Sequence, residues 1–283
     1  MTMNSLLKRE LTGFDLKIIA LITMAISHIY EFFSFTDRVP TILDYIGTIA
    51  EPLFLFMIVE GFIHTSNRAK YILRMYLLGS FMAMMNIVTL YLFPRVDGMS
   101  VSNNIIYPYV MILIFLSGVS IVKEKKLKGI SLMLLPFLGD IFIYFLYYVI
   151  VLTGMRTKLD WLFMAIVRFN PFTLNFGEIG LGGIIGALLL YLLRDKRKAR
   201  IWSYCGFNAL WVFVDATLYY DSFMSIHGPS YFIASFAMQF VVLWLLFMYK
   251  GQRGLAAKRL FYIFYPAHIY LLYALSIWVY NII

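Results

Sequence analysis

The stretch LKIIALITMAISHIY, residues 16–30, decides the fold class because it is a long apolar run that carries two ionisable side chains. Lys17 stands near its start and His28 near its end, with ten uncharged residues between them. The apolar run extends over residues 14–35, and about twenty apolar residues are enough for a helix to cross the hydrocarbon core of a bilayer. The stretch therefore predicts a membrane span that holds both a lysine and a histidine.

The composition of the whole chain is that of an integral membrane protein. Hydrophobic residues make up 62% of the 283 residues and charged residues only 14%, whereas about 25% of the residues in a typical soluble domain are charged. The single cysteine, Cys205, excludes a disulfide framework and a cysteine-based metal site. The net charge of +9 does not indicate nucleic-acid binding, because the basic residues cluster in short loops, a pattern that sets membrane orientation. No cleavable signal peptide is expected at the start.

Nine apolar runs are long enough to cross a membrane. They cover about residues 14–35, 41–63, 69–93, 104–122, 128–153, 174–193, 201–220, 229–249 and 259–281. Residues 155–172 are too short and too charged at both ends to span, which predicts an interfacial or re-entrant helix anchored by Trp161 and ended by Pro171. Every second loop is basic, which places the N-terminus in the cytoplasm and the C-terminus outside. The sequence thus predicts an all-α polytopic membrane helix bundle of about nine transmembrane helices, forming a single domain over residues 1–283.

The spacing of Lys17 and His28 puts both residues on one face of the first span. Eleven residues are close to three helical turns and rise about 16 Å, so Lys17 falls at cytoplasmic headgroup depth and His28 at or beyond the midplane. A phosphopantetheine arm has a similar reach, so one helix can hold a phosphate at its inner end and present a base to a thioester deep in the bilayer. The alternative is structural: Lys17 extends to a lipid phosphate, and His28 bonds a neighbouring backbone group.

The second span carries Glu51, Glu60 and His64. Glu60 and His64 are four residues apart, so they share a helix face and can interact. A carboxylate beside an imidazole is the usual arrangement of a base and its orienting group. The alternative is a polar clasp between helices or, for His64, an ordinary interfacial position. Glu31 lies one turn beyond His28 near the outer interface, where solvation alone explains it.

The last span opens with KRLFYIFYPAHIYLLY, in which His268 follows a proline and is surrounded by Tyr262, Tyr265 and Tyr270. Taken alone, such a run is typical of an aromatic belt with a kink. Together with the histidines of the first two spans, it predicts one buried polar site. The histidine spacings match no zinc motif, so no metal is expected.

Four stretches of the chain resemble the TraX family of bacterial membrane acyltransferases. They are LKIIALITMAISHI, AEPLFLFMIVEGFIHTSNRAKYILRM, NFGEIGLGGIIGALLLYLL and FYIFYPAHIYLLY, and they follow the order and spacing of the family from end to end. The spacing of a basic residue, ten residues and a histidine is also similar to the first-helix motif of the wider acyltransferase-3 superfamily. The chain departs from the family at Ser27, where aspartate is common, and at Thr48 and Glu51, where arginine and phenylalanine are common. Our hypothesis is that Glu51 replaces the missing acid from the neighbouring helix.

The resemblance implies transfer of an acyl group, usually acetyl from cytoplasmic acetyl-CoA, to an amine or hydroxyl at the bacterial inner membrane. The expected acceptor is an envelope glycan, a lipid-linked sugar or a peptide, and His28 is the expected general base. Groups that orient the reactants, bind the acceptor or stabilise the oxyanion are expected to be Glu60 with His64, His268 with Tyr262 and Tyr265, and Glu51. The phosphates of acyl-CoA are expected to bind the basic residues Lys17, Arg68, Lys70 and Arg74.

Two other classes of protein fit parts of the pattern. A proton-coupled secondary transporter would use Glu51, Glu60 and the histidines as proton carriers, but transporters usually show internal repeats and none is visible in this sequence. A non-catalytic scaffold or sensor has no need of ionisable residues inside its spans. Membrane lipids are expected around the chain, and nucleic acid is not an expected partner.

Overall fold

A computed structural model of the protein describes residues 10–153, 163, 166–172, 180–218, 228–256 and 258–283. Within these ranges the backbone is almost entirely helical, with an isolated bridge between Leu11 and Tyr249. The helices, in chain order, are α2 (Gly13–Phe33), the 3-10 helix η1 (Ser34–Thr36), α3 (Ile42–Gly47), α4 (Ala50–His64), α5 (Arg68–Leu92), α6 (Ile106–Ile121), α7 (Lys126–Leu152), α9 (Gly180–Leu192), α10 (Arg197–Leu218), α12 (Gly228–Met248) and α13 (Lys258–Tyr280).

Six of the described helical stretches are long and apolar enough to cross a membrane. They are Gly13–Thr36, Ile42–His64, Arg68–Leu92, Lys126–Leu152, Pro229–Met248 and Arg259–Tyr280. Each coincides with a predicted span, so the all-α, multi-pass membrane fold is confirmed. α6 and α9 are apolar but shorter, and α10 is long but begins with a basic turn that lowers its hydropathy. Most of the predicted interfacial segment, residues 155–172, lies outside the described residues, although residues 166–169 are helical and the helix ends before Pro171.

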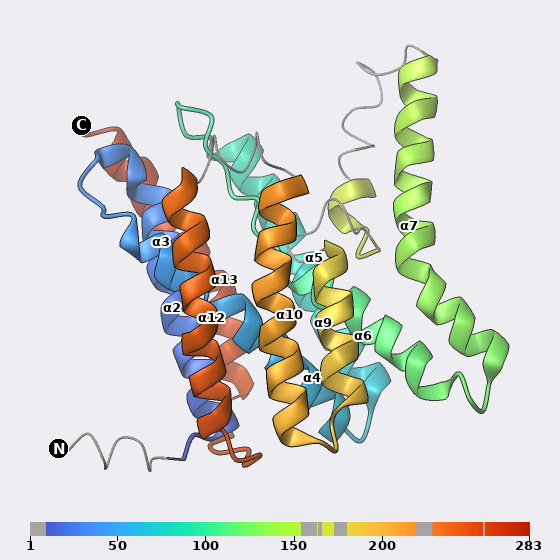
Figure 1. Ribbon diagram of the computed structural model, residues 1–283. Coiled ribbons are helices and arrows are strands. Elements are labelled where there is room, and N and C mark those ends of the chain that lie inside the picture. Colours follow the sequence, from blue (N-terminus) through green and yellow to red (C-terminus); the bar gives the residue numbers. More distant parts are fainter. Residues whose placement is uncertain (1–9, 154–162, 164–165, 173–179, 219–227, 257) are drawn as a thin grey trace, which may run out of the picture. The chain divides into compact units, whose positions relative to one another are not determined.

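The chain packs as two compact units, and the boundary between them falls inside α4. The first unit, Met1–Ile58 with Leu192–Ile283, contains α2, η1, α3, the first part of α4, α10, α12 and α13. In Figure 1, α2, α3, α12 and α13 of this unit gather with their long axes roughly aligned. The second unit, Val59–Tyr191, contains α5, α6, α7 and most of α9.

The start of α2 is fixed by hydrogen bonds that satisfy its first backbone N–H groups. Thr12 forms a capping box: the Asp15 N–H donates to Thr12 Oγ1 at 3.3 Å, and the Thr12 N–H donates to the Asp15 carboxylate at 2.9 Å. The Gly13 N–H donates to the Gln252 carbonyl, 2.7 Å away in the α12–α13 loop. Gly254 in that loop has a φ of +71° and lies too close to Thr12 to carry a side chain. These contacts tie the start of α2 to the loop that leads into α13.

α2 and α13 run in the same direction. The ring of Phe14 contacts that of Phe261 near the starts of the two helices, and Phe32 contacts Tyr273 further along both. Residues later in α2 contact residues later in α13, so the two helices are parallel. The seam between α2 and α13 is therefore the place where ionisable residues of the first and last spans can meet.

α10 and α12 run in opposite directions along their full lengths. Arg197, at the start of α10, donates to the Phe247 carbonyl at 2.6 Å and to the Tyr249 carbonyl at 2.7 Å, at the end of α12. Phe213, near the end of α10, contacts Phe232 near the start of α12. The last carbonyls of a helix lack partners within it, so Arg197 satisfies them and complements the helix dipole. α10 thus runs alongside the whole of α12, which is one of the six helices long and apolar enough to cross a membrane.

α2 and α3 approach closely where Gly47 faces Ser27. A Cβ atom added to Gly47 would overlap the Ser27 side chain, whose hydroxyl donates to the Met24 carbonyl at 3.0 Å within α2. Small residues permit such close packing of membrane helices, where van der Waals contact replaces the hydrophobic effect between them. This crossing leaves no room for a side chain at residue 47, which is a physical reason for glycine at that position.

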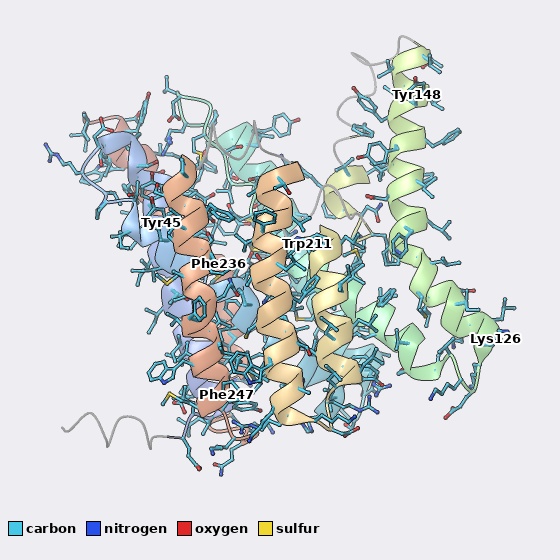
Figure 2. All side chains as sticks on the ribbon, in the orientation of Figure 1. Tyr45, Lys126, Tyr148, Trp211, Phe236 and Phe247 are labelled. Atoms are coloured by element: carbon cyan, nitrogen blue, oxygen red, sulfur yellow. The ribbon has the colours of Figure 1, made fainter. Side chains whose placement is uncertain are left out.

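The second unit contains α6 and α7, which are joined by a short turn. Gly118 of α6 lies against Gly129 and Met133 of α7 too closely for a side chain. Pro136 lies inside α7, and Figure 1 shows a bend along this helix, as expected where a proline removes a backbone hydrogen bond. Many apolar side chains of α7 are exposed, and Figure 2 shows them projecting outward around Tyr148. Such a surface suits contact with lipid.

The close crossing of α2 and α3 predicts a difference between two glycines. Gly47→Ala forces the helices apart and should destabilise the protein by about 1–3 kcal/mol, because overpacking strains a tight contact. Gly206→Ala is the matched control, since nothing lies within 4 Å of a Cβ added there. It should leave stability unchanged or raise it by about 0.5–1 kcal/mol through helix propensity. Melting temperatures in detergent test this, and equal values for the two variants would contradict the packing described.

Candidate functional site

The first unit brings His28 of α2 and His268 of α13 into direct contact. His28 Nδ1 lies 2.8 Å from His268 Nε2, and the two rings stack with their centres 5.0 Å apart. Both residues are buried. The ring of Phe32 lies 6.2 Å from that of His28, and the ring of Phe264 lies 4.9 Å from that of His268. These two histidines, the histidine pair, therefore share a hydrogen bond in an apolar setting, where such a bond is strong and costly to break.

The backbone of α13 determines which nitrogen of each neutral ring carries the proton. His268 Nδ1 lies 2.8 Å from the Phe264 carbonyl, and because a carbonyl oxygen only accepts, Nδ1–H donates to it. His268 Nε2 then has a lone pair, to which His28 Nδ1–H donates. His28 Nε2 is left as the basic nitrogen of the pair. The geometry prepares His28 as a proton acceptor.

A carboxylate lies next to this basic nitrogen. Glu31 Oε2 is 3.6 Å from His28 Nε2, one helical turn further along α2. A proton taken up at Nε2 gives an imidazolium beside the carboxylate, and the opposite charges stabilise each other. Solvation is therefore not the whole role of Glu31, contrary to the interpretation from the sequence. The three-residue spacing of His28 and Glu31 is the signal that identifies such a pair.

Lys17 lies on the same seam, near the start of α2. Its Nζ is 5.4 Å from the centre of the Phe261 ring of α13. Because Lys17 and His28 both contact α13, they share one face of α2, as their spacing predicts. The rise of about 16 Å between them separates the cationic end of the seam from the imidazole.

The tyrosines of α13 lie at different distances from the histidine pair. Tyr265 is buried, and its ring centre lies 6.0 Å from that of His268. Tyr262 and Tyr270 are half-buried. Pro266 lies inside α13 and has no N–H to donate to the carbonyl of Tyr262, four residues earlier. Tyr265 is therefore the predicted tyrosine that the structure places in ring contact with the pair.

Glu51 lies in the first turn of α4, and its side chain is exposed. Its electrostatic neighbours include Tyr204 of α10 and Tyr231 of α12. The carboxylate beside His28 is that of Glu31, so α2 supplies an acid from its own next turn. Glu51 lies among tyrosines, a setting that suits its predicted role in binding substrate.

The second unit holds Glu60 and His64, the other predicted acid–imidazole pair. Glu60 is buried, and its Oε2 lies 3.7 Å from His64 Nε2. The two therefore interact across one helical turn, as their spacing predicts. The His64 side chain is 70% exposed, because it occupies the last residue of α4.

The remaining cations predicted to bind phosphate also lie in the second unit. The guanidinium of Arg68 stacks 4.3 Å from the centre of the Phe62 ring and donates to Ser120 Oγ at 2.9 Å. Lys70 and Arg74 are exposed on the first two turns of α5. Arg68 is thus held by two partners, whereas Lys70 and Arg74 present their charges at the surface of the unit.

The histidine pair can perform general-base chemistry. It combines a base with a fixed tautomer, a partner ring that holds this tautomer, and a carboxylate that stabilises the protonated form. Within the part of the chain that the structure describes, no group of three histidine, cysteine, aspartate or glutamate side chains could hold a metal ion.

The direction of the two hydrogen bonds predicts the tautomers of both rings. At a pH where both are neutral, His28 and His268 should each carry their proton on Nδ1, because the Phe264 carbonyl fixes the chain of donors. Ring 15N chemical shifts of labelled protein in nanodiscs measure this directly. The exposed His64 has no such constraint and serves as an internal reference. A proton on Nε2 of His268 would show that the donors run the other way.

The comparisons with known proteins give one match. No curated protein and no solved structure matches the chain. A family model described as TraX protein matches residues 13–276, which confirms the resemblance seen in the sequence. The match begins at the first residue of α2 and ends within α13, so it includes both members of the histidine pair. The chain therefore belongs to the TraX family.

Proposed function

We propose that this protein is a membrane-embedded acyltransferase, with acyl-CoA as donor and a hydroxyl or amine of an envelope glycan, lipid-linked sugar or peptide as acceptor. The observation that carries the proposal is the histidine pair, in which His28 Nε2 is kept as a base beside Glu31. The TraX resemblance, which implies transfer of acetyl from cytoplasmic acetyl-CoA, supports it. The expected location is the bacterial inner membrane.

In the proposed reaction, His28 Nε2 takes the proton of the acceptor hydroxyl or amine as its oxygen or nitrogen attacks the thioester carbon. The new carbon–oxygen or carbon–nitrogen bond forms, the carbon–sulfur bond breaks, and the CoA thiolate leaves. The proton on His28 then passes to the thiolate, which yields free thiol and restores the base. His268 holds His28 in the reactive tautomer, and Glu31 stabilises the imidazolium.

The basic end of the α2–α13 seam suits the phosphates of acyl-CoA. Lys17 lies about 16 Å of helix rise from His28, which is similar to the reach of a phosphopantetheine arm. Arg68, Lys70 and Arg74 at the start of α5 are the further cations that we propose for phosphate binding. In this proposal, Lys17 and His28 separate phosphate recognition from base chemistry along α2.

We also propose nine membrane crossings with a cytoplasmic N-terminus. α2 and α13 are parallel, and a parallel first and last span requires an odd number of crossings. Six stretches of the described chain meet the length and hydropathy needed, and since six is an even number, this supports an odd number of further crossings. α10 supports this, since it runs the full length of α12. Adding α6, α9 and α10 to the six gives nine.

His28→Gln should lower acyl transfer by about 100-fold or more, because a general base contributes about 10²–10⁴-fold. Release of thiol from acetyl-CoA by the purified protein, with candidate acceptors added, measures the change. Ile29→Leu, on the exposed face of the same helix, is the matched control and should keep full activity. Full activity of the His28 variant would remove this histidine from the reaction.

Variants of His268 separate a positioning role from a packing role. His268→Leu should lower thiol release strongly, because His28 Nδ1–H loses its acceptor. His268→Gln retains an amide oxygen that can accept this bond and should recover part of the activity.

If neither acetyl-CoA-dependent stabilisation nor thiol release occurs, but protons and a solute move together across liposomes, the protein is a proton-coupled transporter.

The proposed topology predicts opposite labelling at the two ends of α10. With the buried Cys205 replaced by serine, Lys198→Cys should react with a membrane-impermeant maleimide only after cells are permeabilised. Thr217→Cys, at the other end of α10, should react in intact cells. Both positions are exposed, so burial does not limit labelling. The same sidedness at both positions would mean that α10 does not cross.

A further inference from the structure

α10 and α12 of the first unit carry a line of polar residues that the proposed chemistry does not use. Ser235 and Gln239 are buried one turn apart on α12, on the same face as the buried Val242 and Leu246. Asn208 lies on α10, one turn after the buried Tyr204. Buried amides inside membrane helices are uncommon and usually mark a polar pathway or site.

The antiparallel register places Asn208 and Gln239 at the same depth. Trp202 contacts Phe247 towards one end of the two helices, and Phe213 contacts Phe232 towards the other. Along such a pair, each step forward on α10 is a step backward on α12, so Asn208 falls level with Gln239. Gln239 is near the middle of α12, so Asn208 of α10 lies level with the middle of α12.

Several buried polar atoms of these residues have no hydrogen bond within the described part of the chain. Gln239 Nε2 donates to the Ser235 carbonyl at 3.5 Å, but Gln239 Oε1 is buried and has no hydrogen-bond partner among the residues that the structure describes. Asn208 Nδ2 and Ser235 Oγ approach Tyr204 and Tyr231, respectively, without meeting hydrogen-bond geometry. An unmade hydrogen bond in a membrane interior costs several kcal/mol, so these atoms are suited to a polar ligand.

Hydroxyl and carboxylate groups extend the line. Tyr204 donates its hydroxyl to the Pro52 carbonyl at 2.8 Å, which ties α10 to the start of α4. Glu51, the residue before Pro52, is the electrostatic neighbour of Tyr204 and Tyr231. We call Glu51, Asn208, Tyr231, Ser235 and Gln239 the polar column.

The polar column lies close in depth to the histidine pair. Tyr231 of the polar column contacts Tyr45 of α3, with ring centres 5.9 Å apart, and Gly47, two residues after Tyr45, packs against Ser27, the residue before His28. A molecule bound along the polar column is therefore at a depth from which one of its groups can reach His28.

We infer that the polar column is the acceptor subsite and that the acceptor is a polyhydroxylated molecule, a sugar, rather than an amine. The inference rests on the proposed acyl transfer and narrows its substrate class. The Gln239 oxygen needs a donor, whereas the Asn208 amide needs an acceptor. A sugar carries several hydroxyl groups, each of which donates and accepts, so it can meet these atoms together, whereas an amine offers a single nitrogen. Rings such as Tyr231 also pack against the apolar face of a sugar.

Three probes with the same alkyl chain test the inference: octyl glucoside, octylamine and 1-octanol. Each is added at equal concentration to wild-type protein in nanodiscs with labelled acetyl-CoA, and mass spectrometry measures acetylated product. The His28→Gln variant gives the background. We expect octyl glucoside to be acetylated at least tenfold faster than the other two. Faster acetylation of octylamine, which mimics a peptide amine, would overturn the inference and leave the proposed function intact.

Substitutions in the polar column supply the second arm. Gln239→Leu and Asn208→Leu should lower kcat/KM for octyl glucoside by about 10- to 100-fold, because each removes a hydrogen bond made inside the membrane. Stabilisation by acetyl-CoA should be unchanged, which shows that the variants fold. Thr217→Val, an exposed polar-to-apolar change on α10, is the control. Unchanged kcat/KM in both variants would overturn the inference.

A binding measurement keeps this inference separate from the proposed function. If wild-type protein acetylates no probe, the acyl transfer proposal fails. A rise in melting temperature with octyl glucoside but not 1-octanol, lost in Gln239→Leu, would then still support a sugar site on the polar column. No difference between the two probes would overturn it.

Discussion

The hydrogen bond between His28 and His268 is the contact on which the first unit depends. Lipid offers no partner to a polar group, so neither helix can slide without leaving an imidazole nitrogen unsatisfied. The Phe264 carbonyl extends the constraint to the backbone of α13. The register of the first and last spans and the tautomer of His28 are therefore consequences of one arrangement.

The same helix is fixed at its other end by different means. The capping box of Thr12 and Asp15, together with the loop before α13, holds the first turn of α2. Lys17 contacts Phe261 shortly after this point. Because both ends of α2 are anchored to α13, the distance between its lysine and its histidine is set by helix geometry alone. In the proposed function, this fixed distance is what orients the acyl-CoA donor along the helix.

Two acids lie on either side of the crossing of α2 and α3. Gly47 packs tightly against Ser27, and Glu31 provides a carboxylate beside His28 from the next turn of α2. Glu51, beyond the crossing, lies near Tyr204 and Tyr231 on α10 and α12. One close helix contact thus separates the acid beside His28 from the acid near the tyrosines of α10 and α12.

The sequence by itself determined the features that depend on local geometry. Apolar runs predicted an all-α membrane protein, and helical spacing predicted the shared face of Lys17 and His28 and the contact of Glu60 with His64. Only the tertiary structure decided that His28 pairs with His268, 240 residues away, that Glu31 is the nearby acid, and that Asn208 lies level with Gln239. Spacing along one helix follows from its fixed rise and turn, whereas contacts between helices depend on how their surfaces pack, and no short stretch of sequence encodes that packing.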